Sequence, residues 1–149
     1  MNIKQLRNEL IRPILDYLEL YSKKAEDLLL GTACQESHAG EYIRQLGCKG
    51  EVGAFGIYQM ELATHNDIWD NYLKYKDDLA LKVSKLKCPT MTDAQNLEYN
   101  LAYATAMCRI HYYRVKEAIP EGTYGQAQYW KKYYNTELGK GTVEEYLQN

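Results

Sequence analysis

The chain has little proline and phenylalanine and no long apolar run. Of its 149 residues, three are proline and one is phenylalanine, while 46% are hydrophobic, which excludes a disordered or collagen-like chain. A secretory signal needs an unbroken apolar stretch, and a membrane span needs roughly 20 apolar residues. The N-terminal region instead carries frequent charges, at Lys4, Arg7, Glu9, Arg12, Asp16 and Glu19. We therefore expect a protein made in the cytoplasm, without a signal peptide or a membrane span, that forms a single domain over residues 1–149.

An excess of charge of one sign is also absent. Eighteen basic and 20 acidic side chains leave a net charge of −2, which gives no electrostatic footprint for nucleic acid, so no nucleic-acid partner is expected. The chain has no glycine-rich phosphate loop of the Walker type either, so nucleotide hydrolysis has no support.

The four cysteines lack the CxxC spacing of zinc ribbons and thioredoxin-like proteins. In a cytoplasmic chain Cys34, Cys48, Cys88 and Cys108 are expected to be free thiols. Cys34, His38 and Cys48 could supply three zinc ligands, but a fourth ligand at a suitable spacing is missing. Buried thiols near a helix end are the favoured alternative, and we expect neither a metal nor another cofactor.

Tyrosine, by contrast, is abundant, with 15 residues. A tyrosine ring combines a flat apolar face with a hydroxyl group, which suits surfaces that stack on polar, ring-shaped ligands. Structural packing with hydrogen-bonded hydroxyls would use the same residues, and composition alone does not decide between the two.

Apolar residues at steps of three and four predict a mainly helical protein. The expected helices run from Ile3 to Leu18, from an N-cap at Ser22 to a stop at Gly40, from Ile68 to Leu86, from a capping box at Thr92 to Val115, from Thr123 to Tyr134, and over a short segment after Thr142. Alanines make the helix that ends at Val115 slim enough to lie at the centre. Glycines at 47, 50, 53 and 56 predict a loop or short hairpin inserted into this helical bundle.

Glu36 is the most informative residue. It follows Ala25, Leu28, Leu29, Thr32 and Ala33 on the apolar face of its helix, near the C-terminal end. Burial and the negative end of the helix dipole would both raise the pKa of a carboxyl group there. A glutamic acid that is protonated near neutral pH can act as a general acid. Alternatively, the helix end reaches solvent and Glu36 is simply hydrated.

Three short motifs follow one another along the chain. Glu36-Ser37 closes a helix, Gly56-Ile57-Tyr58-Gln59 follows the glycine-rich stretch, and Tyr133-Tyr134-Asn135 precedes a turn that contains Gly139. In this order they resemble the Glu-Ser, Gly-Leu-Met-Gln and Ala-Tyr-Asn motifs of the lytic transglycosylase and goose-type lysozyme group of the lysozyme superfamily. The resemblance spans residues 30–141 and implies a lysozyme-like α+β fold.

The resemblance also implies an activity. Members of this group cleave the β-1,4 bond between N-acetylmuramic acid and N-acetylglucosamine in the glycan strands of peptidoglycan. Glu36 would protonate the leaving oxygen and then act as base, either for a water molecule or for the muramoyl 6-hydroxyl, which gives a 1,6-anhydro sugar. Tyr58, Gln59 and Tyr134 would contact the substrate, Asn135 would shape the wall of the cleft, and Ser37 would position the sugar or the neighbouring loop.

The chain departs from the family pattern at several points. Tyr58 replaces the usual methionine, and Tyr133 replaces alanine. The longer segment between Glu36 and Gln59 resembles the goose-type arrangement, in which an acidic residue ahead of the second motif serves a hydrolytic water. Glu51 is the first candidate for that second carboxylate and Glu41 the next. Hydrolysis and transglycosylation both stay open, because the sequence does not give the distance between carboxylates.

A wall-degrading enzyme without a signal peptide must reach a substrate outside the membrane. A bacteriophage origin would resolve this, with the protein either an endolysin released through a holin or a virion component that contacts other virion proteins. Two alternatives remain: a catalytically silent lysozyme-fold virion or peptidoglycan-binding protein, and the same chemistry on chitin or chitosan.

Overall fold

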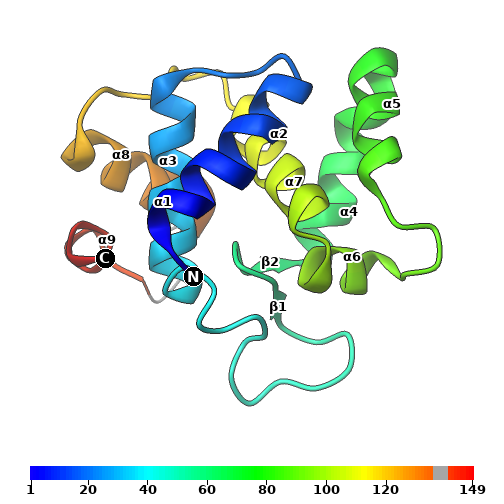
Figure 1. Ribbon diagram of the computed structural model, residues 1–149, viewed down its shortest axis with the longest axis horizontal. Helices are drawn as coiled ribbons and strands as arrows, with labels where there is room; N and C mark the ends of the chain where they lie inside the picture. Colours follow the sequence, from blue (N-terminus) through cyan, green and yellow to red (C-terminus); the bar gives the residue numbers. More distant parts are fainter. Residues whose placement is uncertain (136–140) are drawn as a thin grey trace.

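The computed structural model describes residues 1–135 and 141–149, which are mainly helical, as predicted (Figure 1). In chain order the elements are α1 (Ile3–Gln5), η1 (Leu6–Ile11), α2 (Arg12–Tyr17), α3 (Lys23–Ser37), β1 (Ala54–Phe55), β2 (Met60–Glu61), α4 (Leu62–Asn71), η2 (Leu73–Tyr75), α5 (Asp77–Leu86), α6 (Asp93–Tyr99), α7 (Leu101–Tyr113), α8 (Thr123–Trp130), η3 (Lys131–Asn135) and α9 (Val143–Gln148). In this part of the chain no helix combines the length and apolar character needed to cross a membrane.

The N-terminal segment is one helical run in which η1 is a π-helix. Pro13 has no backbone N–H, and the wider turn that precedes it accommodates this missing donor. The wide turn also rotates the apolar face. Ile11 and Leu15 are therefore fully buried, whereas Ile3, which the simple periodicity places on the buried face, is half exposed.

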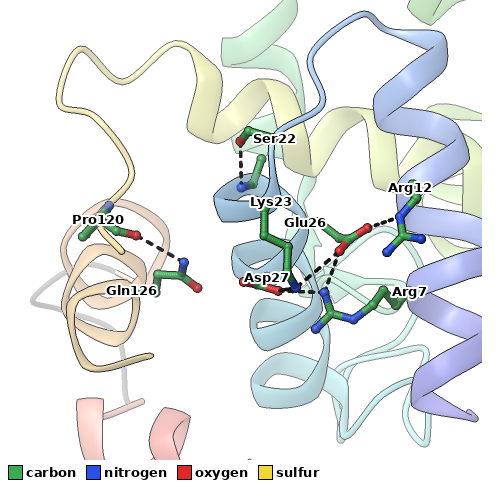
Figure 2. Close-up of polar contacts among 9 residues, drawn as sticks. Arg7, Arg12, Ser22, Lys23, Glu26, Asp27, Pro120 and Gln126 are labelled. Atoms are coloured by element: carbon green, nitrogen blue, oxygen red, sulfur yellow. Dashed lines mark hydrogen bonds and ion pairs between the residues drawn. The ribbon is translucent and has the colours of Figure 1, made fainter. Parts of the chain in front are cut away.

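A buried carboxylate joins this segment to α3. The side chain of Glu26 has no exposed surface, and it pairs with Arg7 at 2.7 Å and with Arg12 at 2.6 Å (Figure 2). Arg7 also pairs with Asp27, one residue further along α3, at 2.7 Å. Both arginines belong to the first helical run, so these ion pairs fix its angle against α3.

Helix α7 contributes residues to two hydrophobic clusters, and it lies between α3 and α4 in Figure 1. One cluster contains Ala104, Cys108 and Tyr112 of α7 together with residues of α3, α8 and α9. The other contains Met107 and Ile110 of α7 together with residues of α4, α5 and α6. The prediction of a central, slim helix packed on several sides is confirmed.

The structure corrects two of the predicted helices. The segment from Ile68 to Leu86 is interrupted after Asn71 by η2, and α5 begins anew at Asp77. The helix expected from the Thr92 capping box to Val115 is broken at Asn100, which is extended and whose side chain caps the backbone N–H of Tyr103. Asparagine is a preferred N-cap, so Asn100 was a readable sign of a new helix.

The predicted helix caps and the short hairpin are confirmed. The hydroxyls of Ser22 and Thr142 accept hydrogen bonds from the backbone N–H groups of Ala25 and Glu145, and Thr92 forms a reciprocal capping box with Gln95. Strands β1 and β2 pair antiparallel, with Ala54 opposite Glu61 and Phe55 opposite Met60.

Candidate active site

Glu36 is the second-last residue of α3, and its side chain is partly buried beside the hairpin turn. The helix ends in a Schellman-type turn, in which the backbone N–H of Ala39 donates to the carbonyl of Ala33 at 3.1 Å. His38 and Ala39 both have left-handed backbones, with φ of 52° and 56°. Non-glycine residues rarely adopt this conformation, and such strain is concentrated at functional sites.

The carboxyl group of Glu36 has a defined partner. Its Oε2 accepts a hydrogen bond of 2.9 Å from the indole Nε1–H of Trp130, which is fully buried. Burial raises the pKa of Glu36 to about 7, even though the bond from Trp130 acts in the opposite direction. A substantial fraction of Glu36 is therefore protonated at neutral pH, as the sequence pattern predicted.

Ser37 connects the helix end to the hairpin turn. Its hydroxyl is fully buried, lies 2.6 Å from the carbonyl oxygen of Ile57 and accepts a 2.9 Å hydrogen bond from the backbone N–H of Gly40. Of the two roles suggested for Ser37, these contacts correspond to positioning the neighbouring loop. A direct contact with a sugar would require the hydroxyl to be exposed.

Tyr58 and Gln59, the last two residues of the second motif, differ in their burial. Tyr58 is 1% exposed and its hydroxyl pairs with Thr105 at 2.9 Å, so its side chain fills the core and the prediction that it contacts the substrate is wrong. Gln59 is partly exposed, with its Nε2 donating to the carbonyl of Gly56 at 2.9 Å. Gln59 has a φ of 48°, so it is another non-glycine residue with a left-handed backbone near the end of α3.

The third motif lies on the π-helix η3, and its Tyr134 contacts the second motif. The Tyr134 hydroxyl donates to the backbone carbonyl of Tyr58 at 2.5 Å, and its ring stacks on Tyr112 with centroids 5.3 Å apart. Asn135 accepts a hydrogen bond from Lys131 through Oδ1 at 2.7 Å. Gly139, the glycine expected in the following turn, lies outside the described residues.

Three hydrogen bonds therefore connect the region of Glu36 with segments that are far apart in the sequence. Ser37 contacts Ile57, Tyr134 contacts Tyr58, and Trp130 contacts Glu36. Glu36 also acts electrostatically on Tyr134, whose pKa is raised well above its ordinary value, first by burial.

Trp130 is a residue of this site that no sequence motif predicted. It lies four residues before Tyr134, so a helix that continues through both residues places them on one face. That spacing was the available sign that Trp130 would point toward the same region as the third motif.

The candidates for a second carboxylate are both exposed. Glu51 lines a hollow of about 250 Å³ together with Arg44, Glu98 and Tyr99, and Glu36 does not line it. Glu41 follows the turn at the end of α3, where its backbone N–H donates to the carbonyl of His38 at 3.4 Å. The pairing of either residue with Glu36 stays a prediction.

The described chain contains no cluster of three or more His, Cys, Asp and Glu side chains that could hold a metal ion. Cys34, His38 and Cys48 therefore do not form the zinc site that their spacing left open. All four cysteines are free thiols.

Comparisons with protein-family models, with curated proteins and with solved structures found no match to this chain. The function therefore has to be inferred from the geometry and chemistry around Glu36.

Proposed function

We propose that the protein is a peptidoglycan-degrading glycosidase with a lysozyme-like fold. It would cleave the β-1,4 bond between N-acetylmuramic acid and N-acetylglucosamine, with Glu36 as the general acid. The observation that carries the proposal is the Glu36 carboxyl group itself. Its pKa is raised to about 7 by burial and its orientation is fixed by Trp130, the two properties that a proton donor at neutral pH needs.

The hydrogen bond from Trp130 also distinguishes the two oxygens of Glu36. An indole N–H is only a donor and a carbonyl oxygen is a better acceptor than a carboxylic hydroxyl, so this bond favours a neutral carboxyl group with its proton on Oε1. In the proposed reaction Oε1 protonates the glycosidic oxygen as the bond to the sugar carbon breaks. The carboxylate that results then takes a proton from the attacking hydroxyl group, either that of water or the muramoyl 6-hydroxyl.

The other residues of the site have supporting roles in this proposal. Gln59 and Tyr134 lie on the segments that meet beside Glu36, and Asn135 follows Tyr134 on η3. They are the residues proposed to contact the sugar or to shape the cleft. Ser37 would hold the hairpin turn at its distance from the acid.

The activity can be tested by incubating the protein with purified sacculi and analysing the soluble products by mass spectrometry. Muropeptides with a 1,6-anhydro end lack one water relative to hydrolysed ends, so the same spectrum distinguishes transglycosylation from hydrolysis. Release of sugars from chitin but not from sacculi would change the substrate. Binding to sacculi without any release would identify a silent binding protein instead.

Glu36→Gln separates catalysis from stability. Glutamine has nearly the same volume but cannot transfer a proton, so we expect the rate on sacculi to fall by about 10²–10⁴-fold. The folded state raises the pKa of Glu36 above its ordinary value of 4.5, which costs stability as pH rises from about 4.5 to 7. The melting temperature of Glu36→Gln should therefore equal or exceed that of the wild type at pH 8, with a smaller difference at pH 5.

Glu51→Gln is the matched comparison, because Glu51 is exposed and the substitution removes the same charge. A Glu36→Gln protein that keeps most of the wild-type rate would contradict the assignment of the acid. Loss of activity in Glu51→Gln, with an unchanged melting temperature, would identify Glu51 as the second carboxylate of a hydrolase.

A further inference from the structure

Arg109, on α7, is a buried cation that pairs with no carboxylate among the described residues. It is 7% exposed, its Nε donates to the backbone carbonyl of Leu20 at 3.0 Å, and its guanidinium carbon lies 5.2 Å from the centre of the Tyr113 ring. Every other arginine pairs with a carboxylate, although each is more exposed: Arg7 with Glu26 and Asp27, Arg12 with Glu26, Arg44 with Glu98, and Arg114 with Asp67.

This arrangement is unfavourable for the protein alone. Removing a charged group from water costs several kcal/mol unless a charge of opposite sign compensates it. Burial lowers the pKa of Arg109 below its ordinary value, but a guanidinium remains charged at neutral pH. One hydrogen bond and one aromatic face compensate only part of that cost, and none of the described carboxylates compensates the rest.

The surface beside Arg109 is hollowed. A pocket of about 290 Å³ is lined by Arg109, by the aromatic rings of Tyr112, Tyr113 and Tyr129, and by the cationic side chains of Lys24 and Lys116. Glu117 is the one carboxylate among its lining residues, and its side chain is engaged by Tyr133 and Lys132. Lys24 makes only a loose contact of 3.6 Å with Glu121, which is largely exposed.

The N-terminus of α3 opens onto the same pocket. Ser22, the N-cap of this 15-residue helix, is a lining residue and lies at the N-terminal end of α3 in Figure 2. The first backbone N–H groups of a helix have no intrahelical acceptor, and the helix dipole makes this end positive. A helix N-terminus, a buried guanidinium and two lysines thus converge on one cavity.

We propose that this pocket binds a small oxyanion, with Arg109 as its central ligand and with phosphate or a phosphate monoester as the preferred species. The cations that line it outnumber its carboxylate, which favours a dianion over a singly charged carboxylate. The tyrosine rings would border whatever group the phosphate carries. The pocket lies at the opposite end of α3 from Glu36, about 18 Å away along the helix axis, since Lys24 and Glu36 are 12 residues apart. It is independent of the proposed glycosidase activity.

The test uses thermal unfolding at pH 7 with inorganic phosphate, with sodium acetate and with sodium chloride at matched ionic strength. Phosphate should raise the melting temperature by about 4 °C at ten times its dissociation constant, and further in proportion to the logarithm of its concentration above that. Acetate should have a weaker effect and chloride none beyond that of ionic strength. An equal effect of acetate would identify a carboxylate site in place of the phosphate site, and an equal effect of chloride would overturn the proposal.

Arg109→Met removes the charge and keeps most of the unbranched stem. We expect the response to phosphate to disappear, while the melting temperature without phosphate stays equal to that of the wild type or rises. Arg114→Met is the control, because Arg114 pairs with Asp67 and does not line the pocket. It should keep the full response.

Lys116→Gln provides a second, milder variant on an exposed residue, in case Arg109→Met does not fold. It should weaken phosphate binding severalfold, measured as the severalfold higher phosphate concentration that gives the same shift in melting temperature as in the wild type. A phosphate response that is unchanged in Lys116→Gln and in every folded Arg109 variant would show that the anion binds elsewhere, and the proposal would fail.

Discussion

At the scale of single residues, the chemistry of Glu36 depends on a neighbour 94 positions away in the chain. Trp130 supplies the hydrogen bond that orients the carboxyl group, and the surrounding apolar side chains raise its pKa to about 7. The protein contains one other tryptophan, Trp69, whose indole Nε1–H donates to the hydroxyl of Tyr103 at 2.9 Å. The two indoles therefore report on different parts of the molecule.

Because the two indoles lie in different parts of the molecule, their N–H resonances can test the pKa of Glu36 in an NMR titration that requires no substrate. The indole N–H resonance of Trp130 should shift with a midpoint near pH 7 as Glu36 ionises, and Glu36→Gln should abolish the shift. His111 lies close to the third motif, but burial lowers its pKa to about 4, so its titration is separate. The Trp69 resonance should not follow the same curve, although His65, which contacts Tyr103, can shift it at lower pH because burial lowers the His65 pKa.

A Trp130 resonance that does not move between pH 5 and 9 would mean that Glu36 has an ordinary pKa, and it would remove the observation that carries the proposed function. A titrating resonance in a protein that releases no muropeptides would leave the electrostatics intact and reject the activity alone.

At the scale of elements, the hairpin is placed by close contact with α6. Gly56 has a φ of 78°, and a Cβ atom added there would lie 2.0 Å from the backbone carbonyl oxygen of Leu97. That oxygen belongs to a helix and cannot rotate away. The backbone of Gly56 also donates to the carbonyl of Ile43 at 2.7 Å, so the turn is tied on both sides.

Gly56→Ala should therefore displace the turn that carries Gln59 and receives the bonds from Ser37 and Tyr134. We expect a loss of roughly 2–4 kcal/mol in the free energy of unfolding, measured with urea, and a loss of activity in the protein that remains folded. Gly50→Ala is the control, because Gly50 also has a positive φ, of 64°, but nothing lies within 4 Å of its added Cβ. Equal losses in the two variants would show that backbone strain alone, without contact with α6, accounts for the effect.

The ion pairs of Glu26 predict how the junction between the N-terminal helical run and α3 responds to pH (Figure 2). Burial alone would raise the pKa of Glu26, but its bonds to Arg12 and Arg7 outweigh burial and lower it below 4.5. A carboxylate with a lowered folded-state pKa stabilises the protein above its unfolded pKa, and this contribution is lost as pH falls through the folded pKa.

Glu26→Gln should lower the free energy of unfolding by about 2 kcal/mol at pH 7. This loss is smaller than that expected for breaking a fully buried ion pair, because Arg7 and Arg12 can both reach solvent when the carboxylate of Glu26 is removed. Urea denaturation at several pH values should show the difference from the wild type shrinking below about pH 4.5. Lys82 pairs with Glu19 at the surface, so Glu19→Gln serves as the exposed control and should change the free energy of unfolding much less than Glu26→Gln does. A Glu26→Gln effect independent of pH would show that the charge is not what stabilises the junction.

At the scale of the whole molecule, α7 contributes to both hydrophobic clusters, so neither can lose its packing without affecting the other. Trp130 belongs to the first cluster, and Trp69 packs against the second. Leu28→Ala, at a fully buried position of the first cluster, should lower the free energy of unfolding by about 2–5 kcal/mol. If the chain folds as one cooperative unit, both tryptophans should report the same lowered unfolding midpoint.

Fluorescence of Trp69→Phe and Trp130→Phe proteins, each with and without Leu28→Ala, gives the two signals separately. Transitions that coincide support the single domain predicted from the chain length. A midpoint lowered for Trp130 and unchanged for Trp69 would divide the molecule into two units along α7.

The helical class, the caps at Ser22, Thr92 and Thr142, the short hairpin and the position of Glu36 on the apolar face of its helix could be predicted from the sequence, because each depends on residues within a few positions of one another. The sequence did not reveal that Tyr58 lies in the core, that Trp130 holds Glu36 or that Arg109 is buried with no carboxylate partner among the described residues. The break after Asn71 belongs with these, since several helices must change direction to cover both faces of α7, whereas the N-cap residue Asn100 was readable in the sequence. Burial and pairing depend on which segments meet in space, and periodicity along the chain carries no information about the element on the other side of a contact.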